Sequence, residues 1–339
     1  MSDAMGVYVH SPPTIGRPVR FPDKPVRSLF PDTSLGRAID RERRIKFDSI
    51  SNRARLNYGP EKKVSPIVGA KAETNREEGA RMRVIVVLTG ASRGAGKGIA
   101  LALGAAGATV YVTGRSVSGG DSPYGGTVAE TARLITESGG KGIAVAVDHA
   151  DDQAVAALFD RIKQEHGKLD ILVNNAANLI AATTDAGGFW EKPFEAVELL
   201  NVGLRSHFVA SYYAAPLLIA NGRGLIVNTG LYGAVSYFRG PVYGAQKAGA
   251  DKMAADMATE LRPHNVAAVS IWMGGLDTER ARVYLASLPP ELRPTAERES
   301  PQFTGRIIAA LYDSDQRMQL SGRALIWADP LEVHSSLMA

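Results

Sequence analysis

From Arg83 onward, short apolar runs rich in β-branched residues alternate with longer segments of helical periodicity. This order constrains the fold most, because a helix that crosses from one strand to the next leaves the two strands parallel. The runs are continuously apolar, as expected for strands that helices cover on both faces. The sequence predicts an α/β fold with a single, doubly wound parallel sheet of about seven strands and helices on both faces.

The predicted elements extend from residue 83 to near the end of the chain. Strands are expected at 84–88, 109–112, 143–147, 171–173, 225–227, 266–271 and 324–327, and helices at about 96–106, 125–138, 152–165, 194–218, 243–261 and 302–313. The series shows no internal repeat and no second core. We therefore predict one domain over residues 83–339.

The first 82 residues differ in composition from this domain. Eight of the eighteen prolines lie within residues 1–81, and no stretch keeps a helix or strand period. Residues 1–81 carry 16 Lys and Arg against 10 Asp and Glu, whereas the remainder carries 23 against 25. We predict a Pro/Arg-rich extension over 1–82 that is largely unstructured, unless translation begins at Met82.

The composition excludes several kinds of site and partner. The 339 residues contain no cysteine, which rules out disulfides and thiol nucleophiles, and the six histidines lack metal-ligand spacing, so no metal is expected. No apolar run reaches the ~20 residues of a membrane span. The nearly neutral domain offers little electrostatic basis for nucleic-acid binding. We predict a cytoplasmic protein with no membrane span and no nucleic-acid partner.

A glycine-rich loop follows the first predicted strand and leads directly into a helix. Residues 89–96 read Thr-Gly-Ala-Ser-Arg-Gly-Ala-Gly. Gly90 permits a tight turn, Gly94 lets the backbone approach a pyrophosphate, and Gly96 lets the helix pack closely on the sheet. The free N–H groups of the helix N-terminus would bind the anion. The loop therefore predicts a Rossmann-type dinucleotide site rather than a tight turn without a ligand.

The end of the second strand bears on the choice between NAD and NADP. An acidic residue is expected there for the ribose of NAD, but residues 112–116 read Val-Thr-Gly-Arg-Ser. Arg115 and Arg93 could together neutralise a 2′-phosphate, so NADP (NADPH) is the predicted cofactor, unless both arginines are simply solvated. Asp148, after the third strand, could lie beside the adenine or cap the helix that begins near Asp152.

Tyr243 and Lys247 lie four residues apart on a predicted helix, so their side chains share one face. This spacing alone is common by chance, but the pair follows the glycine loop and the fifth strand. A nearby ammonium is expected to lower the pKa of the phenol towards the operating pH. The pair would then serve as a proton donor and acceptor.

These motifs, in this order, resemble the short-chain dehydrogenase/reductase family. The resemblance covers about 83–339 and rests on the glycine loop, Asn-Asn-Ala at 174–176 and Tyr-x-x-x-Lys at 243–247. The segments 189–193, 201–205 and 251–256 look like the subgroup of dehydrogenase/reductase SDR family member 1. That subgroup implies NADPH-dependent reduction of carbonyls, including steroids and xenobiotics.

The resemblance implies a role for each matching residue. Tyr243 would donate a proton to a carbonyl oxygen while the nicotinamide delivers hydride, and Lys247 would hold the ribose hydroxyls and tune Tyr243. Asn201 matches the position that holds a water in the proton relay, or it is only a polar residue that kinks its helix. Asn174 matches a position that stabilises the central strand. The residues expected to bind the cofactor are Gly90, Ser92, Arg93, Gly94, Gly96, Arg115, Asp148, Asn175, Tyr243, Lys247 and Thr278.

Two departures from the family pattern bear on activity. Gly230, thirteen residues before Tyr243, replaces the serine that binds the substrate oxygen, and Met273 replaces a proline at the rim of the nicotinamide pocket. Tyr232 or a water could supply the missing hydrogen bond, or Tyr232 could merely line the pocket. Two functions stay open: an NADP(H)-dependent oxidoreductase that interconverts a carbonyl and an alcohol, and an NADP-binding protein with little or no turnover.

Large apolar residues follow the strand ends where a substrate would enter. Phe189, Trp190 and Tyr284 predict a pocket for a small apolar carbonyl or alcohol, unless they pack a lid onto the domain. The resemblance also implies a homodimer or homotetramer, because family members usually pair the helices expected at 194–218 and 243–261.

Overall fold

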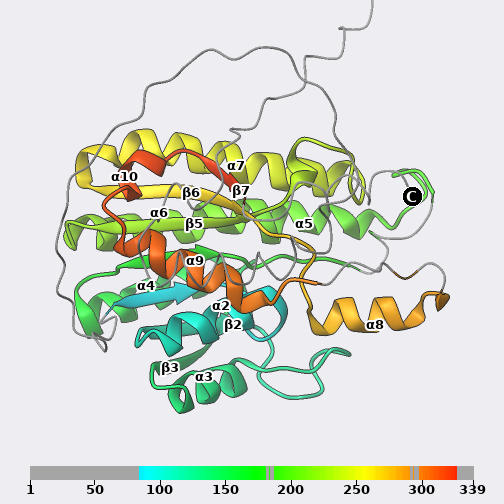
Figure 1. Ribbon diagram of the computed structural model, residues 1–339, viewed down its shortest axis with the longest axis horizontal. Coiled ribbons are helices and arrows are strands. Elements are labelled where there is room, and N and C mark those ends of the chain that lie inside the picture. Colours follow the sequence, from blue (N-terminus) through cyan, green and yellow to red (C-terminus); the bar gives the residue numbers. More distant parts are fainter. Residues whose placement is uncertain (1–83, 181–182, 184–186, 291–292, 294–297, 327–339) are drawn as a thin grey trace, which may run out of the picture. The chain divides into compact units, whose positions relative to one another are not determined.

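One parallel sheet forms the centre of the described protein (Figure 1). The computed structural model describes residues 84–180, 183, 187–290, 293 and 298–326. The strand order is β3-β2-β1-β4-β5-β6-β7, and every pairing is parallel. The strands are β1 (Ile85–Leu88), β2 (Thr109–Gly114), β3 (Lys141–Ala146), β4 (Ile171–Asn174), β5 (Gly224–Gly230), β6 (Val266–Trp272) and β7 (Ala324–Ile326). The predicted doubly wound α/β fold is confirmed.

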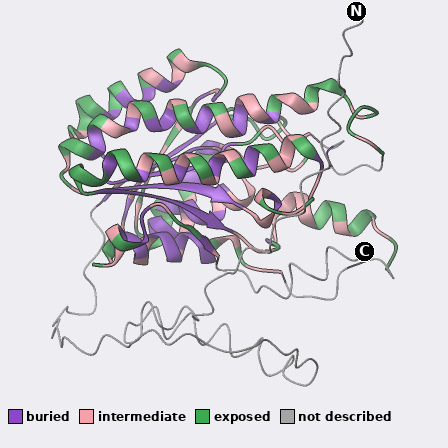
Figure 2. Ribbon diagram, turned by 90° about the horizontal axis from the view of Figure 1, so that it is seen from above, coloured by how far each residue is buried: buried purple, intermediate pink, exposed green. Residues whose placement is uncertain are grey.

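Helices cover both faces of this sheet, with their buried sides turned towards it (Figure 2). The described α-helices are α2 (Gly94–Ala105), α3 (Val128–Glu137), α4 (Asp152–His166), α5 (Glu198–Leu200), α6 (Ser206–Ala220), α7 (Pro241–Leu261), α8 (Glu279–Ser287), α9 (Pro301–Asp313) and α10 (Arg317–Leu320). α2 packs against α3 and α9, whereas α6 packs against α4 and α7. Because helices cover both faces, every residue of β5 and β6 is buried, which explains the continuous apolar runs.

The chain adds β2 and β3 on one side of β1 and then crosses over to add β4 to β7 on the other side. Strand β1 pairs with β2 on one side and with β4 on the other. All strands are parallel, so the loops after β1, β4, β5 and β6 leave from the same edge of the sheet. A crevice at such a switch point is where open α/β sheets bind their ligands.

The helix expected at 194–218 is broken. A 3₁₀ turn at Phe194–Val197 and α5 precede a π-helical turn at Asn201–Arg205, after which α6 begins. Gly203 has φ of +151°, which favours glycine. The carbonyls that this break releases find other donors, because Val202 O accepts from Asn178 N at 2.7 Å and Gly203 O accepts from Gln246 Nε2 at 2.6 Å. A periodicity argument misses such a break, since the apolar pattern continues through it.

Two further differences concern loops. The helix expected at 125–138 begins at Val128, because Gly125 and Gly126 adopt positive φ and Thr127 caps the helix by accepting from Glu130 N. α8 was not predicted, since it is short and buries none of its residues.

Some predictions lie outside the described residues. These are the unstructured extension over 1–82, the alternative start at Met82, the domain boundary between them and the last strand residue at 327. No helix in the described ranges is long and apolar enough to cross a membrane.

A buried carboxylate ties together four elements at the amino-terminal edge of the sheet. Asp170, just before β4, accepts from Ile85 N on β1 at 2.9 Å. It also accepts from Asn221 Nδ2 after α6 at 2.8 Å and from the Tyr312 hydroxyl on α9 at 2.7 Å. Lys168 Nζ also lies 3.5 Å from Oδ2, so removing this carboxylate takes the acceptor from three hydrogen-bond donors and one ammonium.

We expect Asp170→Ala to lower the free energy of unfolding by about 2–4 kcal/mol, since buried donors lose their partner. Urea unfolding measures this difference. Asp160→Ala, an exposed aspartate on α4, is the matched control and should stay within about 0.5 kcal/mol of the wild type. Equal stabilities of the two variants would contradict a structural role for Asp170.

Candidate active site

The glycine loop after β1 is packed against the end of β4. Gly90 and Gly94 have φ of +66° and +60°, where glycine is favoured. A Cβ at Gly90 would lie 2.6 Å from Ala176 Cα, and one at Gly96 would lie 2.3 Å from the Gly90 carbonyl oxygen. Asn175, directly after β4, donates from Nδ2 to the Gly90 carbonyl at 2.9 Å. Asn175 therefore braces the predicted cofactor loop.

A carboxylate lies at the N-terminus of α2. Glu279, the first residue of α8, accepts from Gly94 N at 2.9 Å. The N-cap residue Arg93 makes no side-chain cap, so the first-turn N–H groups and the positive end of the helix dipole are directed at an anion. A dinucleotide pyrophosphate is an anion of the kind that such a helix N-terminus binds.

A cavity of about 310 Å³ lies beside this helix end, between α2, α8 and the start of α9. Gly94, Lys97, Glu279 and Arg282 are among the residues that line it. Thr278 caps α8 by accepting from Ala281 N at 3.2 Å. A Cβ at Gly94 would lie 3.8 Å from Thr278 Cγ2, so the predicted cofactor residue Thr278 lies next to the glycine loop.

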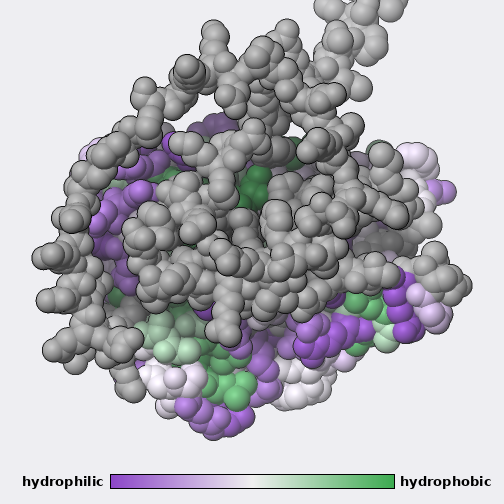
Figure 3. Space-filling view, in the orientation of Figure 1, coloured by the Kyte–Doolittle hydropathy of each residue, from purple (hydrophilic) through white to green (hydrophobic). Residues whose placement is uncertain are grey.

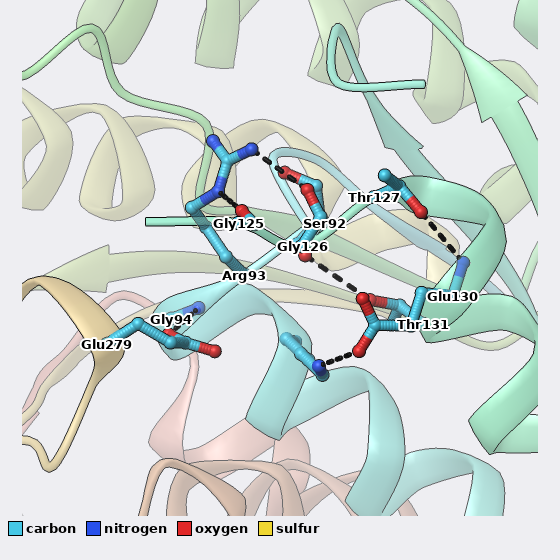
Figure 4. A network of polar contacts seen from close by, with 10 residues as sticks. Ser92, Arg93, Gly94, Gly125, Gly126, Thr127, Glu130, Thr131 and Glu279 are labelled. Atoms are coloured by element: carbon cyan, nitrogen blue, oxygen red, sulfur yellow. Dashed lines mark hydrogen bonds and ion pairs between the residues drawn. The ribbon is translucent and has the colours of Figure 1, made fainter. Parts of the chain in front are cut away.

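Arg93 is engaged by the loop that follows β2 (Figure 4). Its Nε donates to the Gly125 carbonyl at 2.6 Å, and its Nη2 donates to Ser116 Oγ at 2.6 Å and to the Gly126 carbonyl at 2.9 Å. Arg93 therefore holds this loop against the glycine loop. Nη1 makes no hydrogen bond within the described ranges.

Arg115 directly follows β2 and is exposed, with Nη1 4.0 Å from Asp148 Oδ2. Asp148 follows β3, so the two predicted cofactor residues lie together at the carboxyl ends of neighbouring strands. Ser92 is buried in the glycine loop. Capping of α4 by Asp148 is wrong, because the N-cap is Asp151, which accepts from Gln153 N at 2.9 Å.

Tyr243 and Lys247 meet on the first turns of α7. Lys247 Nζ lies 5.6 Å from the centroid of the Tyr243 ring and donates to the Thr229 carbonyl of β5 at 2.9 Å. The Phe238 ring packs on Tyr243 with centroids 5.6 Å apart. A Cβ at Gly233 would lie 3.2 Å from Tyr243 Cε1. The structure thus brings the predicted pair to the carboxyl end of β5.

Burial changes the pKa values of both groups. It raises the pKa of Tyr243 to about 12, with Arg239 opposing the rise. The predicted lowering of the Tyr243 pKa is wrong, because the loss of water around the phenol outweighs nearby positive charge. Burial lowers the pKa of Lys247 to about 8, and the carboxylate of Asp251 opposes this fall. At pH 7 Tyr243 is protonated and Lys247 is mainly charged.

The two candidate asparagines lie at the end of β4 and at the break before α6. Asn201 begins the π-helical turn and donates from Nδ2 to Glu198 Oε2 at 3.1 Å, so it lies at the kink, as one of its two interpretations expected. Asn174 donates to Asn228 Oδ1 of β5 and to Ser211 Oγ of α6, both at 2.9 Å. It links β4 to its neighbours.

The position of the missing serine has no room for a side chain. A Cβ at Gly230 would lie 2.5 Å from both Ser270 Oγ and Trp272 Cδ1. Met273 N donates to the Gly230 carbonyl at 3.3 Å, which a proline could not do. The two departures from the family pattern, Gly230 and Met273, are therefore joined by a hydrogen bond at the ends of β5 and β6.

Tyr232 lies in the aromatic cluster around Tyr243. Its ring centroid is 4.9 Å from that of Phe238, which in turn packs on Tyr243. Burial raises the pKa of Tyr232, so its hydroxyl keeps its proton at neutral pH. A hydrogen-bond donor is thus present close to the predicted proton donor.

The apolar residues predicted for the substrate pocket lie at the surface. Phe189 and Trp190 are 65% and 75% exposed and pack edge to face, and Tyr284 on α8 is 47% exposed. Hydrophobic patches are visible among hydrophilic residues on the described surface in Figure 3. None of the three lines the cavity beside α2 and α8, and residues 184–186 and 294–297 lie outside the described ranges.

Sequence reasoning missed two residues of this region. Glu279 lies in the unpredicted helix α8, and no local signal connects it to α2. Asp251 lies four residues after Lys247, a spacing that could have identified it as a neighbour of the ammonium.

The family model described as short chain dehydrogenase matches residues 84–287. The chain belongs to the short-chain dehydrogenase/reductase family. Dehydrogenase/reductase SDR family member 1 of Mus musculus is 38% identical over 253 residues, which are 71% of this chain and 78% of the mouse protein. The resemblance to that subgroup is therefore confirmed.

More distant relatives of this family are also similar to the chain. The 1-cyclohexenylcarbonyl-CoA reductase of Streptomyces collinus is 30% identical and is matched over 64% of this chain and 74% of the relative. A hydroxysteroid dehydrogenase from Escherichia coli has a TM-score of 0.59 at 25% identity, over 73% of this chain and 96% of that structure.

Membership in the short-chain dehydrogenase/reductase family makes the protein an oxidoreductase that acts on alcohols or carbonyls with an NAD(P) cofactor. The closely packed glycine loop and the anion position on α2 fit such a cofactor. Within the described ranges, no three His, Asp or Glu side chains converge as a metal ion would require.

We expect Glu279→Gln to tighten cofactor binding about twofold to fivefold, since a carboxylate at a helix N-terminus is stabilised by 0.3–1 kcal/mol and competes with the pyrophosphate. Fluorescence titration with NADPH and NADH at low ionic strength measures this change. Glu260→Gln, an exposed glutamate on α7, serves as the control. Weaker binding by Glu279→Gln would show that the carboxylate does not compete.

Proposed function

We propose that the protein is an NADP(H)-dependent oxidoreductase that interconverts a carbonyl and an alcohol on a small apolar substrate. The observation that carries this proposal is the Tyr243/Lys247 pair, in which the buried ammonium lies 5.6 Å from the ring centroid of the protonated Tyr243. The pair lies at the same sheet edge as the glycine loop. This arrangement is suited to proton transfer beside a dinucleotide.

Each residue of the pair has a separate task in carbonyl reduction. When bound, the nicotinamide supplies the hydride. The Tyr243 hydroxyl donates its proton to the carbonyl oxygen, and the Lys247 ammonium stabilises the phenolate that this transfer leaves. Asn201 and its kinked helix would hold the relay that returns a proton to this pair. In alcohol oxidation the same steps run in reverse.

The hydrogen bond that the family's serine makes to the substrate oxygen must come from elsewhere. We assign it to the Tyr232 hydroxyl, which is protonated and lies in the cluster with Tyr243. Gly230 favours a second candidate function, NADP binding with little or no turnover, because losing such a donor costs about 3 kcal/mol of transition-state stabilisation. A turnover measurement decides between the two functions.

Arg115 supports NADP over NAD. It is exposed at the carboxyl end of β2, where an acidic residue would otherwise bind the ribose, and Asp148 orients it from β3. Arg93 shapes the adjoining loop, and its Nη1 is directed at no partner within the described ranges. Both arginines can therefore approach a 2′-phosphate.

The substrate is proposed to be apolar and to carry a ring. Relatives of this family are named for a hydroxysteroid and for a cyclohexenylcarbonyl thioester. Phe189, Trp190 and Tyr284 would cover the apolar part of such a molecule. We also propose a homodimer or homotetramer through α6 and α7, because Phe208 and Tyr212 are exposed one turn apart on α6.

Turnover of NADPH with a panel of aldehydes, ketones, quinones and steroid ketones tests the proposed function. We expect activity in the wild type and a loss of about 10²–10⁴-fold in Tyr243→Phe, since the proton donor is removed. Tyr237→Phe, an exposed tyrosine of the preceding loop, should keep wild-type rates. Tight NADPH binding without turnover of any substrate would support the second candidate instead.

Arg115→Ala tests the cofactor preference. We expect its Kd for NADPH to rise about fivefold and its Kd for NADH to stay unchanged, because an exposed charge contact contributes about 1 kcal/mol. Arg133→Ala, which removes an exposed arginine of α3, is the control. An equal rise for both cofactors would argue against recognition of the 2′-phosphate.

A further inference from the structure

A carboxylate lies directly behind the proposed Tyr243/Lys247 pair. Asp251 follows Lys247 by one turn of α7, so both side chains share the helix face that packs on β5 and β6. Asp251 Oδ1 accepts from Ser270 Oγ at 2.5 Å, and Oδ2 accepts from Trp272 Nε1 at 2.8 Å. Ser270 and Trp272 are two residues apart on β6 and hold both oxygens from the same side of the strand.

Gly230 provides the space for this arrangement. It pairs with Trp272 across the β5–β6 ladder. A Cβ on Gly230 would lie 2.5 Å from Ser270 Oγ and 3.1 Å from Asp251 Oδ1. Any larger residue at position 230 would displace the donors of the carboxylate. The absence of a serine at 230 and the presence of the Asp251 network are therefore one structural feature.

Most of the groups around Lys247 disfavour its charged form, so an anion held nearby is needed to favour it. Its Nζ is buried and donates to the Thr229 carbonyl of β5. Burial and the positive charge of Arg239, in the loop before α7, both disfavour the ammonium. Burial also keeps His207 of α6 neutral, since it lowers the pKa of that imidazole to about 3. Within the described ranges, Asp251 is the anion that favours the charged lysine.

We propose that Asp251, held by Ser270 and Trp272, is a positioning residue that keeps the buried Lys247 charged beside Tyr243. This inference rests on the proposed function, because the charged lysine matters only if Tyr243 transfers a proton. Asp251 itself does not reach the reacting atoms. It acts through Lys247, and its effect must therefore appear in the pH dependence of the reaction.

The direction of that effect follows from the charge of the lysine. The pKa of Lys247 is about 8, so the ammonium is present below this pH and is lost above it. Carbonyl reduction by the wild type should therefore fall as the pH rises through about 8. Removing the carboxylate favours the neutral amine and moves this fall to lower pH, by about one unit or more for a close opposite charge.

The test compares Asp251→Asn with Asp256→Asn, the same substitution at an exposed aspartate of the same helix. The profile of kcat/KM for NADPH-dependent carbonyl reduction is measured between pH 5.5 and 9.5. On the alkaline side of this profile, kcat/KM of Asp251→Asn should fall at a pH about one unit lower than that of the wild type. At the acid end of the profile the two values should be nearly equal. Asp251→Glu should restore the pH of this fall, and Asp256→Asn should leave it unchanged. An unshifted fall in Asp251→Asn would overturn the proposal.

A second readout does not depend on turnover. In protein labelled at lysine ¹³Cε, the Lys247 signal is identified by its absence in Lys247→Arg and is followed through a pH titration. Its midpoint should fall in Asp251→Asn and stay in Asp256→Asn. If the wild type reduces no carbonyl, the proposed function fails while this titration still decides the role of Asp251.

Ser270→Ala covers the case in which Asp251→Asn does not fold. This substitution removes one of the two donors that hold the Asp251 carboxylate, and its loss raises the pKa of Asp251. The Lys247 midpoint should move in the same direction by a smaller amount. An unchanged midpoint in a folded Ser270→Ala protein would contradict the proposal.

Discussion

The pairing of β1 with β2 on one side and with β4 on the other is the constraint on which the rest of the structure depends. All strands are parallel, so this pairing brings the loops after β1, β4, β5 and β6 to one edge of the sheet. The glycine loop, the end of β4 and the end of β5 are far apart in the chain and come together at this edge, as the bonds of Asn175 to Gly90 and of Thr229 to Asn174 show. The candidate active site is a consequence of strand order.

Close approach at this edge is possible only where the chain carries no bulky side chain. Gly90 lies against Ala176, and Gly96 lies against the Gly90 carbonyl. The same principle operates at Gly230, where the missing Cβ leaves room for the donors of a buried carboxylate. Packing thus explains why glycine, and not serine, stands at position 230. This explanation does not require that activity has been lost.

Carboxylates have different roles at the two ends of the site. At α2, Glu279 accepts from the Gly94 N–H, at a helix end that favours negative charge. At α7, burial destabilises the Lys247 ammonium and Asp251 partly restores it. Both carboxylates come from positions that no cofactor or catalytic motif contains. At Asp251 the effect depends on burial, which strengthens interactions between charges.

The sequence by itself determined the parallel α/β fold, the glycine loop and the helix that carries Tyr243 and Lys247, because periodicity, glycine spacing and helical pitch are local properties. It did not reveal the break at Gly203, the helix α8, the engagement of Arg93 or the raised pKa of Tyr243. Those features depend on which distant segments pack together and how much water they exclude. Only the tertiary structure decided them, since hydrogen-bond partners, burial and free space arise when the elements meet.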